Sequence, residues 1–260
     1  MSEAPFVFFM LFSVLLVEKL VMVRPVTSWP LLIGAGLATA ALLLVRYFGL
    51  PIVGAIIFYV LVRLRNWRAV VFAAIVGLGV MVPTFGFGAE AAMARYGSMG
   101  TSLLGFLNLG DAAISRPGSA NVAAWITSDL GFGAAILRNT RHLLTSALPD
   151  TIMLLFGGPQ VTAFFASIGL GYLPIILQGV ISAMIILGYG LCLRRRLTVI
   201  EVIAPAYIFF LLVITQGRWP DMGSAFRYIF PMIPFVLVYF LYTVQALDRL
   251  GRRQSWWPET

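Results

Sequence analysis

Long uncharged and mostly apolar stretches alternate with short polar segments along this chain. Residues 69–89 carry no charge, and residues 151–193 are uncharged over 43 positions. A helix needs about 20 apolar residues to cross the hydrocarbon core of a bilayer. The runs are continuous and do not alternate with the period of two that a strand shows. They therefore predict transmembrane helices and favour a helix bundle over a barrel.

Basic residues stand between these runs, and their positions predict the topology. Eleven of the eighteen Lys and Arg fall in four clusters: Lys19 with Arg24; Arg63, Arg65 and Arg68; Arg194 to Arg196; and Arg249, Arg252 and Arg253. Cytoplasmic loops are enriched in Lys and Arg, so we place all four clusters in the cytoplasm. The N-terminus then lies outside, the C-terminal tail lies inside, and seven spans result: residues 5–22, 30–45, 50–62, 69–89, 173–193, 197–216 and 228–247.

Two parts of this topology admit another interpretation. The 50–62 run is shorter than a full crossing requires, which makes residues 30–62 alternatively a shallow hairpin. The stretch before residue 173 is broken at Gly157-Gly158-Pro159. A second span there would put the Arg194–Arg196 cluster outside, so we expect this stretch to be interfacial or re-entrant.

The expected fold class is an all-α polytopic transmembrane bundle of about seven spans, some of them short or re-entrant, with one larger outer loop region. In this organisation residues 1–89 form transmembrane helices, and residues 90–172 form the outer loop and interfacial helices. Residues 173–247 form the remaining transmembrane helices, and residues 248–260 form a cytoplasmic tail. The part of the outer region up to residue 150 fits either an acceptor-binding loop or a plain cap on the bundle.

Composition agrees with a membrane protein and narrows the function. Hydrophobic residues make up 60% of the chain and charged ones 11%, with a mean hydropathy of +0.96, whereas soluble domains carry about 25% charged residues. The topology clusters account for the net charge of +8, so no nucleic-acid partner is predicted. The chain has one histidine, His142, and one cysteine, Cys192, and it lacks nucleotide-loop and zinc-ligand motifs. No metal site is therefore predicted.

Two arginines at the expected outer ends of helices are candidate ligands for phosphate. Arg46 ends one apolar run just before Tyr47-Phe48-Gly49, and Arg227 stands immediately before Tyr228-Ile229-Phe230-Pro231. The planar guanidinium fork binds oxyanions through two hydrogen bonds, which suits a phosphate or pyrophosphate group. An arginine that snorkels to lipid phosphates explains the same positions, and the residues alone leave both interpretations open.

Three motifs in this chain resemble those of the GT-C membrane glycosyltransferases of the protein mannosyltransferase and aminoarabinose transferase type, which are family 39-like. The run from Arg227 to Pro234 is similar to the Arg-Tyr-x-x-Pro-x-x-Pro signature that opens the last helices of those enzymes. The start Ser2-Glu3-Ala4-Pro5-Phe6 resembles the Ser-Glu-x-x-Phe of a middle helix. The run from Gly36 to Gly49 resembles a small-residue helix that ends in an arginine and a glycine. The motifs follow in the family's order over nearly all of the chain.

The resemblance implies an activity and a set of site residues. Enzymes of this kind move a sugar from a polyprenyl-phosphate donor to an acceptor hydroxyl on the outer side of the membrane, with inversion. An acidic side chain acts as the general base that activates the acceptor hydroxyl, and arginines hold the lipid phosphate. The resemblance assigns lipid-phosphate and donor contact to Arg227, Tyr228 and Arg46, and a place in the outer cavity to Glu3. It implies the lipid-linked sugar and membrane lipid as partners and assigns no further cofactor. The need for a divalent metal and for a membrane-protein partner is left open.

The chain departs from the family at the catalytic acid. That acid lies in the first outer loop of the family, and this chain begins at a helix that follows the loop. We therefore expect a C-terminal portion of a longer enzyme, and Met1-Ser2-Glu3 also lacks the positive start of a signal peptide. Asp111, Asp129, Asp150 and Asp221 are acids on the expected outer side, but none of them inherits the catalytic role by motif.

The missing acid keeps two other functions open. One is a transporter or flippase for lipid-linked or small solutes, and the other is a non-catalytic scaffold subunit. Transporters often carry inverted repeats and charges near mid-membrane, and the sequence shows neither. The short loops favour the bacterial inner (plasma) membrane, with the C-terminus in the cytoplasm.

Overall fold

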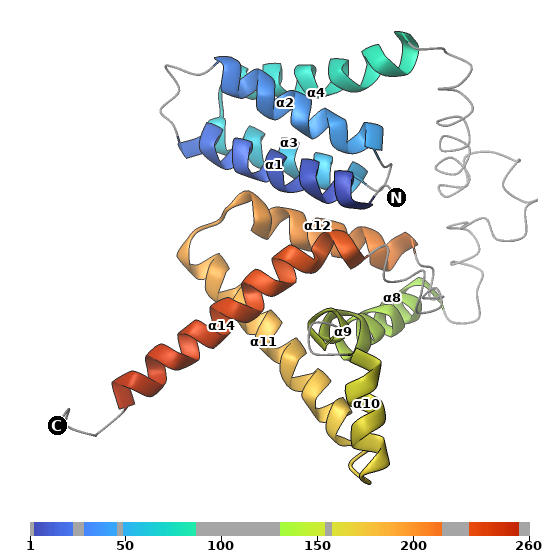
Figure 1. Ribbon diagram of the computed structural model, residues 1–260. Coiled ribbons are helices and arrows are strands. Elements are labelled where there is room, and N and C mark those ends of the chain that lie inside the picture. The colour runs from blue at the N-terminus through green and yellow to red at the C-terminus, as the bar shows by residue number, and fades with distance from the viewer. Residues whose placement is uncertain are drawn as a thin grey trace, which may run out of the picture. The chain divides into compact units, whose positions relative to one another are not determined.

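The computed structural model describes residues 3–22, 29–45, 49–86, 131–153, 158–214 and 229–254. Every regular element in these ranges is a helix (Figure 1), so the all-α prediction is confirmed for the described part of the chain. The chain divides into two compact units. Met1–Asn139 with Pro205–Pro220 form the first unit, and Thr140–Ala204 with Asp221–Thr260 form the second.

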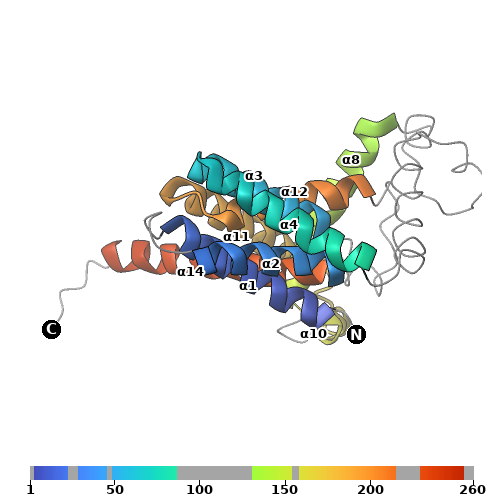
Figure 2. The ribbon, with the colours of Figure 1, turned by 90° about the horizontal axis from the view of Figure 1, so that it is seen from above.

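Four apolar helices make up most of the described first unit: α1 (Glu3–Met22), α2 (Trp29–Val45), α3 (Leu50–Leu64) and α4 (Trp67–Gly86). α2 packs against α1 and α4, and α3 contacts all three (Figures 1 and 2). Small residues bring α2 and α4 close together. A Cβ on Gly36 would lie 2.6 Å from Ile75 Cγ2, and one on Gly79 would lie 2.8 Å from Ala40 Cβ. Such residues let helix backbones approach where lipid supplies no hydrophobic drive between helices.

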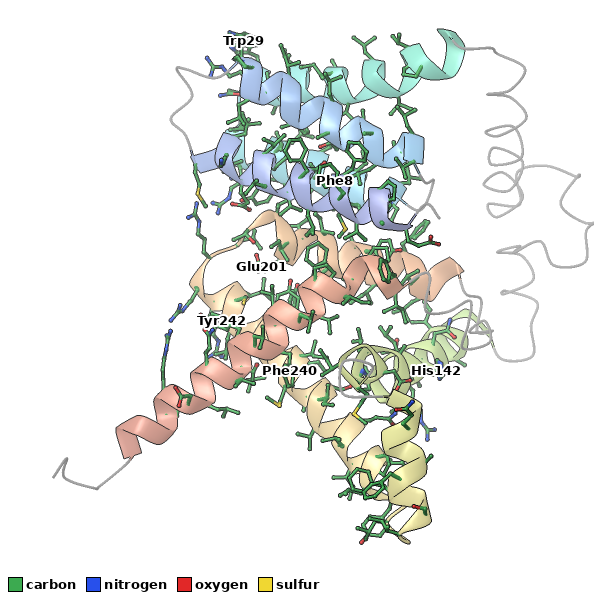
Figure 3. All side chains as sticks on the ribbon, in the orientation of Figure 1. Phe8, Trp29, His142, Glu201, Phe240 and Tyr242 are labelled. Atoms are coloured by element: carbon green, nitrogen blue, oxygen red, sulfur yellow. The ribbon has the colours of Figure 1, made fainter. Side chains whose placement is uncertain are left out.

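Polar and aromatic side chains gather where helices of this unit start and end. Trp29 lies at the start of α2 (Figure 3) and packs on Trp67 at the start of α4, with 5.4 Å between the ring centroids. The Arg68 guanidinium lies 5.9 Å from the centroid of the Trp29 ring. Near the ends of α1 and α3, the Tyr59 hydroxyl donates a 3.1 Å hydrogen bond to Glu18 Oε1. Tryptophan and arginine concentrate at membrane–water interfaces, so these helix ends have the chemistry of an interface. The side of the membrane that they face stays a prediction.

The described second unit is built mainly from α9 (Leu148–Met153), α10 (Gly158–Ser167), α11 (Leu173–Arg195) and α14 (Ile233–Gln254). α11 and α14 cross each other (Figure 1), and α9 packs against both. Gly188 of α11 stands at the crossing, where a Cβ would collide with the carbonyl oxygen of Tyr239. Beside it, the Thr243 hydroxyl donates a 2.7 Å hydrogen bond to the Met184 carbonyl. A glycine and an interhelical hydrogen bond therefore fix how α14 sits on α11.

Two further helices are divided between the units: α8 (Gly131–His142) and α12 (Val199–Ile214). Within the first unit, Asn139 of α8 donates a 3.0 Å hydrogen bond to the Leu212 carbonyl of α12. This contact ties a helix from the expected outer region to the apolar helices.

Helix length limits how many of these elements can cross a membrane. Within the described residues, three helices are long and apolar enough: Glu3–Met22, Leu173–Arg195 and Phe230–Leu250. The apolar parts of α2, α3, α4 and α12 are shorter. α3 has 15 residues, which cover about 22 Å, against a hydrocarbon core of about 30 Å. Six of the seven expected spans are helical wherever they are described, and the span expected at 197–216 is helical from Val199. Length supports three of the seven as crossings, and the number seven stays a prediction.

The expected break at Gly157-Gly158-Pro159 coincides with the start of a helix. α9 ends at Met153, and α10 begins at Gly158. Pro159 then stands in the first turn of α10, where its missing N–H costs no intrahelical hydrogen bond. A turn with Gly169 at φ +77° leads from α10 into α11, and glycine adopts this conformation without steric cost. Residues 158–195 thus form a helical hairpin, whose interfacial or re-entrant placement stays a prediction.

Candidate functional site

The structure describes one of the four residues that the sequence assigns to the site. Arg227, Tyr228 and Arg46 lie outside the described residues. Glu3 stands half-buried in the first turn of α1, where the helix dipole stabilises a carboxylate. The proximity of these four residues to one another is therefore still a prediction.

The last long apolar helix follows Arg227 and Tyr228 in the sequence, and prolines stand at its start. Pro231 lies in a single 3-10 turn, Phe230–Met232, and Pro234 lies in the first turn of α14. Proline fits these positions because the N–H groups of a first helical turn have no intrahelical acceptor. Pro231 and Met232 are buried. The two prolines thus set where the last long apolar helix starts, directly after the candidate phosphate ligands.

An acid from the expected outer region meets a long apolar helix in the second unit. The Gln178 side-chain Nε2 of α11 donates a 2.9 Å hydrogen bond to Asp150 Oδ1 of α9. Asp150 is half-buried, and His142 at the end of α8 (Figure 3) is near enough for its charge to act on it. Among the described residues, no hydrogen-bond donor meets the second carboxylate oxygen, Oδ2. This oxygen is the part of the group that remains for a ligand.

The electrostatics of Asp150 are those of a carboxyl that holds its proton more tightly than usual. Burial raises the pKa of Asp150 above its ordinary value, and it is the largest effect. The hydrogen bond from Gln178 and the charge of His142 lower the pKa and partly offset burial. A carboxyl with a raised pKa, held by a specific partner, is a candidate for proton transfer.

A π-helical turn places Asp150 opposite Gln178. Residues Leu143–Ala147 form this turn between α8 and α9, and the Leu148 N–H bonds to the Leu143 carbonyl, five residues back. The next donor in that pattern would be residue 149, which is a proline and has no N–H. The Leu144 carbonyl, which residue 149 cannot bond, accepts a hydrogen bond from the Ser182 hydroxyl of α11.

Ser182 and Gln178 act together because they lie four residues apart on α11, which puts them on one face of the helix. One side chain bonds the π turn and the other bonds Asp150. Single π turns inside helices occur frequently at functional sites. The sequence gives no signal for this pairing, because Asp150 and Gln178 are 28 positions apart and belong to different helices.

A second polar cluster in the same unit has a structural role. Glu201 in the first turn of α12 is only 6% exposed. Its Oε2 accepts a 2.7 Å hydrogen bond from the Thr198 N–H and a second bond from the Thr198 hydroxyl. The Tyr189 hydroxyl donates to the Glu201 backbone carbonyl at 3.2 Å. The spacing Thr-x-x-Glu is that of a capping box, so the sequence carries a signal for this cluster. Its role is to cap the start of α12.

The described residues contain no group of three or more His, Cys, Asp or Glu side chains that could hold a metal ion.

Comparisons with models of known protein families, with curated proteins and with solved structures found no match to this chain.

Proposed function

We propose that this chain is a membrane-embedded glycosyltransferase of the GT-C kind. It would move a sugar from a polyprenyl-phosphate donor to an acceptor hydroxyl at the outer face of the membrane. The observation that carries the proposal is the Arg-Tyr-x-x-Pro-x-x-Pro run at residues 227–234. Its two prolines begin the last long apolar helix, as the helix-opening role of that signature requires.

The packing of the second unit adds a second argument. α9 carries the half-buried Asp150, and α9 packs against α14, the helix that the motif opens. An acid from the expected outer region and the motif helix thus belong to one unit. Sugar transfer to a hydroxyl is helped by a carboxylate near the acceptor, which takes the hydroxyl proton, and by cationic groups at the leaving phosphate.

The proposal gives each candidate residue a task. Arg227, with Tyr228 beside it, contacts the donor phosphate, and Arg46 is the second cation; Glu3 belongs to the outer cavity. The lipid-linked sugar is the donor substrate, and membrane lipid surrounds the helices. The full topology has seven spans in the bacterial inner membrane, with a cytoplasmic C-terminus, and the short helices cross only if the bilayer thins locally or their ends extend.

The test is sugar transfer by the full chain in lipid nanodiscs, with a radiolabelled polyprenyl-phosphate sugar and a mixture of acceptors. Arg227→Ala should lower use of the donor by about 10²–10³-fold, because it removes a cation that stabilises charge on the leaving phosphate. Arg227→Lys should restore part of the activity, since it keeps the charge but not the fork. Arg218→Ala is the matched control, because Arg218 stands in the same segment outside the motif.

Two results would contradict the proposal in different ways. Unchanged donor kinetics for Arg227→Ala would remove Arg227 from the site. Absence of transfer by the wild-type chain, together with solute uptake into proteoliposomes that contain it, would make the chain a transporter.

A further inference from the structure

We propose that Asp150 is the group that accepts the proton of the acceptor hydroxyl, and that Gln178 positions it. This inference rests on the transferase function proposed above and assigns its missing base. It starts from one juxtaposition: the 2.9 Å hydrogen bond that joins Asp150 of α9 to Gln178 of α11 beside a π turn.

The carboxylate has a fixed half and an open half. Oδ1 is held by Gln178, and the turn that precedes Asp150 is held by Ser182. Two bonds to one face of α11 therefore set the direction of the carboxylate. Oδ2 meets no donor from the described residues, and the side chain is half-buried. A hydroxyl can reach such an oxygen, and a general base must lie within hydrogen-bond distance of the proton that it takes.

The surroundings of Asp150 suit a base. The parts of α11 and α14 that precede their basic ends, residues 173–193 and 233–247, carry no Asp, Glu, Lys or Arg. Among the described residues, the charge that acts on Asp150 is that of His142 in α8. Burial raises the pKa of Asp150, while His142 and Gln178 limit the rise. The carboxylate is thus a stronger base than an exposed aspartate, and a stronger base takes a hydroxyl proton more readily.

The chemical step balances without a further reactant. The acceptor O–H proton passes to Asp150 Oδ2 as the hydroxyl oxygen forms a bond to the anomeric carbon. The bond between that carbon and the phosphate oxygen breaks, and the polyprenyl phosphate leaves with the electron pair. Arg227 stabilises the charge on this leaving group, and Asp150 later returns its proton to water.

Asp150→Asn is the decisive variant, because its carboxamide oxygen can still accept the bond from Gln178 but cannot take a proton. We expect the transfer rate at saturating substrate to fall by about 10²–10⁴-fold, with the Michaelis constant for the donor almost unchanged. Asp150→Glu should recover part of the rate. Asp248→Asn is the matched control, since it makes the same chemical change at an exposed position of α14.

Gln178→Leu tests whether Gln178 positions Asp150 or only contributes to the packing of the helices. The Gln178 hydrogen bond lowers the pKa of Asp150, so its loss should raise that pKa. The acid limb of the pH–rate profile should then move to higher pH, whereas a purely structural glutamine would lower the activity equally at all pH values. The shift of the acid limb in Gln178→Leu also tests the role of Asp150 if Asp150→Asn fails to fold.

The outcomes separate the two proposals. Transfer by Asp150→Asn within about threefold of the wild-type rate, or an unshifted acid limb for Gln178→Leu, would overturn the role of Asp150 and leave the transferase function standing. A wild-type chain that binds labelled donor and transfers nothing under any condition would overturn the transferase function, and the role of Asp150 would fall with it.

Discussion

Gly188→Ala tests the crossing of α11 and α14, which supports the rest of the second unit. A Cβ at this position would collide with the Tyr239 carbonyl oxygen and lie 2.6 Å from the carbonyl carbon and 2.8 Å from Thr243 Oγ1. Most of these atoms belong to the backbone of α14, which cannot turn aside as a flexible side chain can. The two helices must therefore separate to admit one methyl group.

The size of the effect follows from three contributions. Overpacking of a close contact costs about 1–3 kcal/mol. Separation of the helices also stretches the hydrogen bond from Thr243 to the Met184 carbonyl, and such interhelical bonds in membranes contribute about 0.6 kcal/mol on average. Alanine favours a helix over glycine by about 1 kcal/mol. The net loss is then about 0.6–2.6 kcal/mol, or roughly 1–10 °C in apparent melting temperature for a chain of this size.

The assay is thermal unfolding of purified protein in detergent micelles, followed by tryptophan fluorescence at one fixed heating rate. The same helix offers two matched controls, Gly179→Ala and Gly190→Ala, because a Cβ at either position meets nothing within 4 Å. Both controls should be as stable as the wild type or slightly more stable, since alanine reduces the freedom of the unfolded chain. Thr243→Val should cost less in the Gly188→Ala background than in the wild type, because residues in one contact are not independent.

Equal melting temperatures for Gly188→Ala and Gly190→Ala would refute the reasoning. That result would mean that α11 and α14 do not cross at Gly188, and that the contacts of α9 with this helix pair need another explanation.

Tyr59→Phe removes the hydroxyl that donates to Glu18 and should cost about 1 kcal/mol or more; an unchanged apparent melting temperature would show that the bond adds nothing. Thr198→Ala removes one side of the capping box with Glu201 and should cost about 0.5–2 kcal/mol, measured as a lower midpoint of chemical unfolding. Burial raises the pKa of Asp150, so the folded state binds this proton more tightly than the unfolded state. Stability should therefore fall as pH rises from the ordinary aspartate pKa through the raised one, and melting temperatures across an acidic-to-neutral buffer series should lose that slope in Asp150→Asn.

The positions of the helices follow closely from the sequence, and the differences have local causes. The expected span at 173–193 is α11, Leu173–Arg195, and the expected span at 5–22 is α1, Glu3–Met22. α11 extends into the basic cluster because long arginine side chains reach water from a helix end. The last helix starts later than expected, at Ile233, because the prolines before it first impose a 3-10 turn.

Less of the candidate site than of the helices could be predicted from the sequence. The sequence singled out Asp150 as one of several outer acids, but it gave no reason to prefer that acid or to connect it with Gln178. The preference comes from a π turn before Pro149 and from the face that α11 presents to α9. Neither feature has a periodic signature, since each depends on which carbonyl finds a donor on another helix.

What the sequence by itself determined is the class of protein and the positions of its apolar helices. These properties depend on the number of consecutive apolar residues and on charges near their ends, which can be counted along the chain. The tertiary structure alone decided which helices cross, where Gly188 admits a neighbouring backbone, and which acid meets a partner. Those features depend on contacts between residues far apart in the chain, and a bilayer does not select among them, because its tails are as apolar as the helix surfaces.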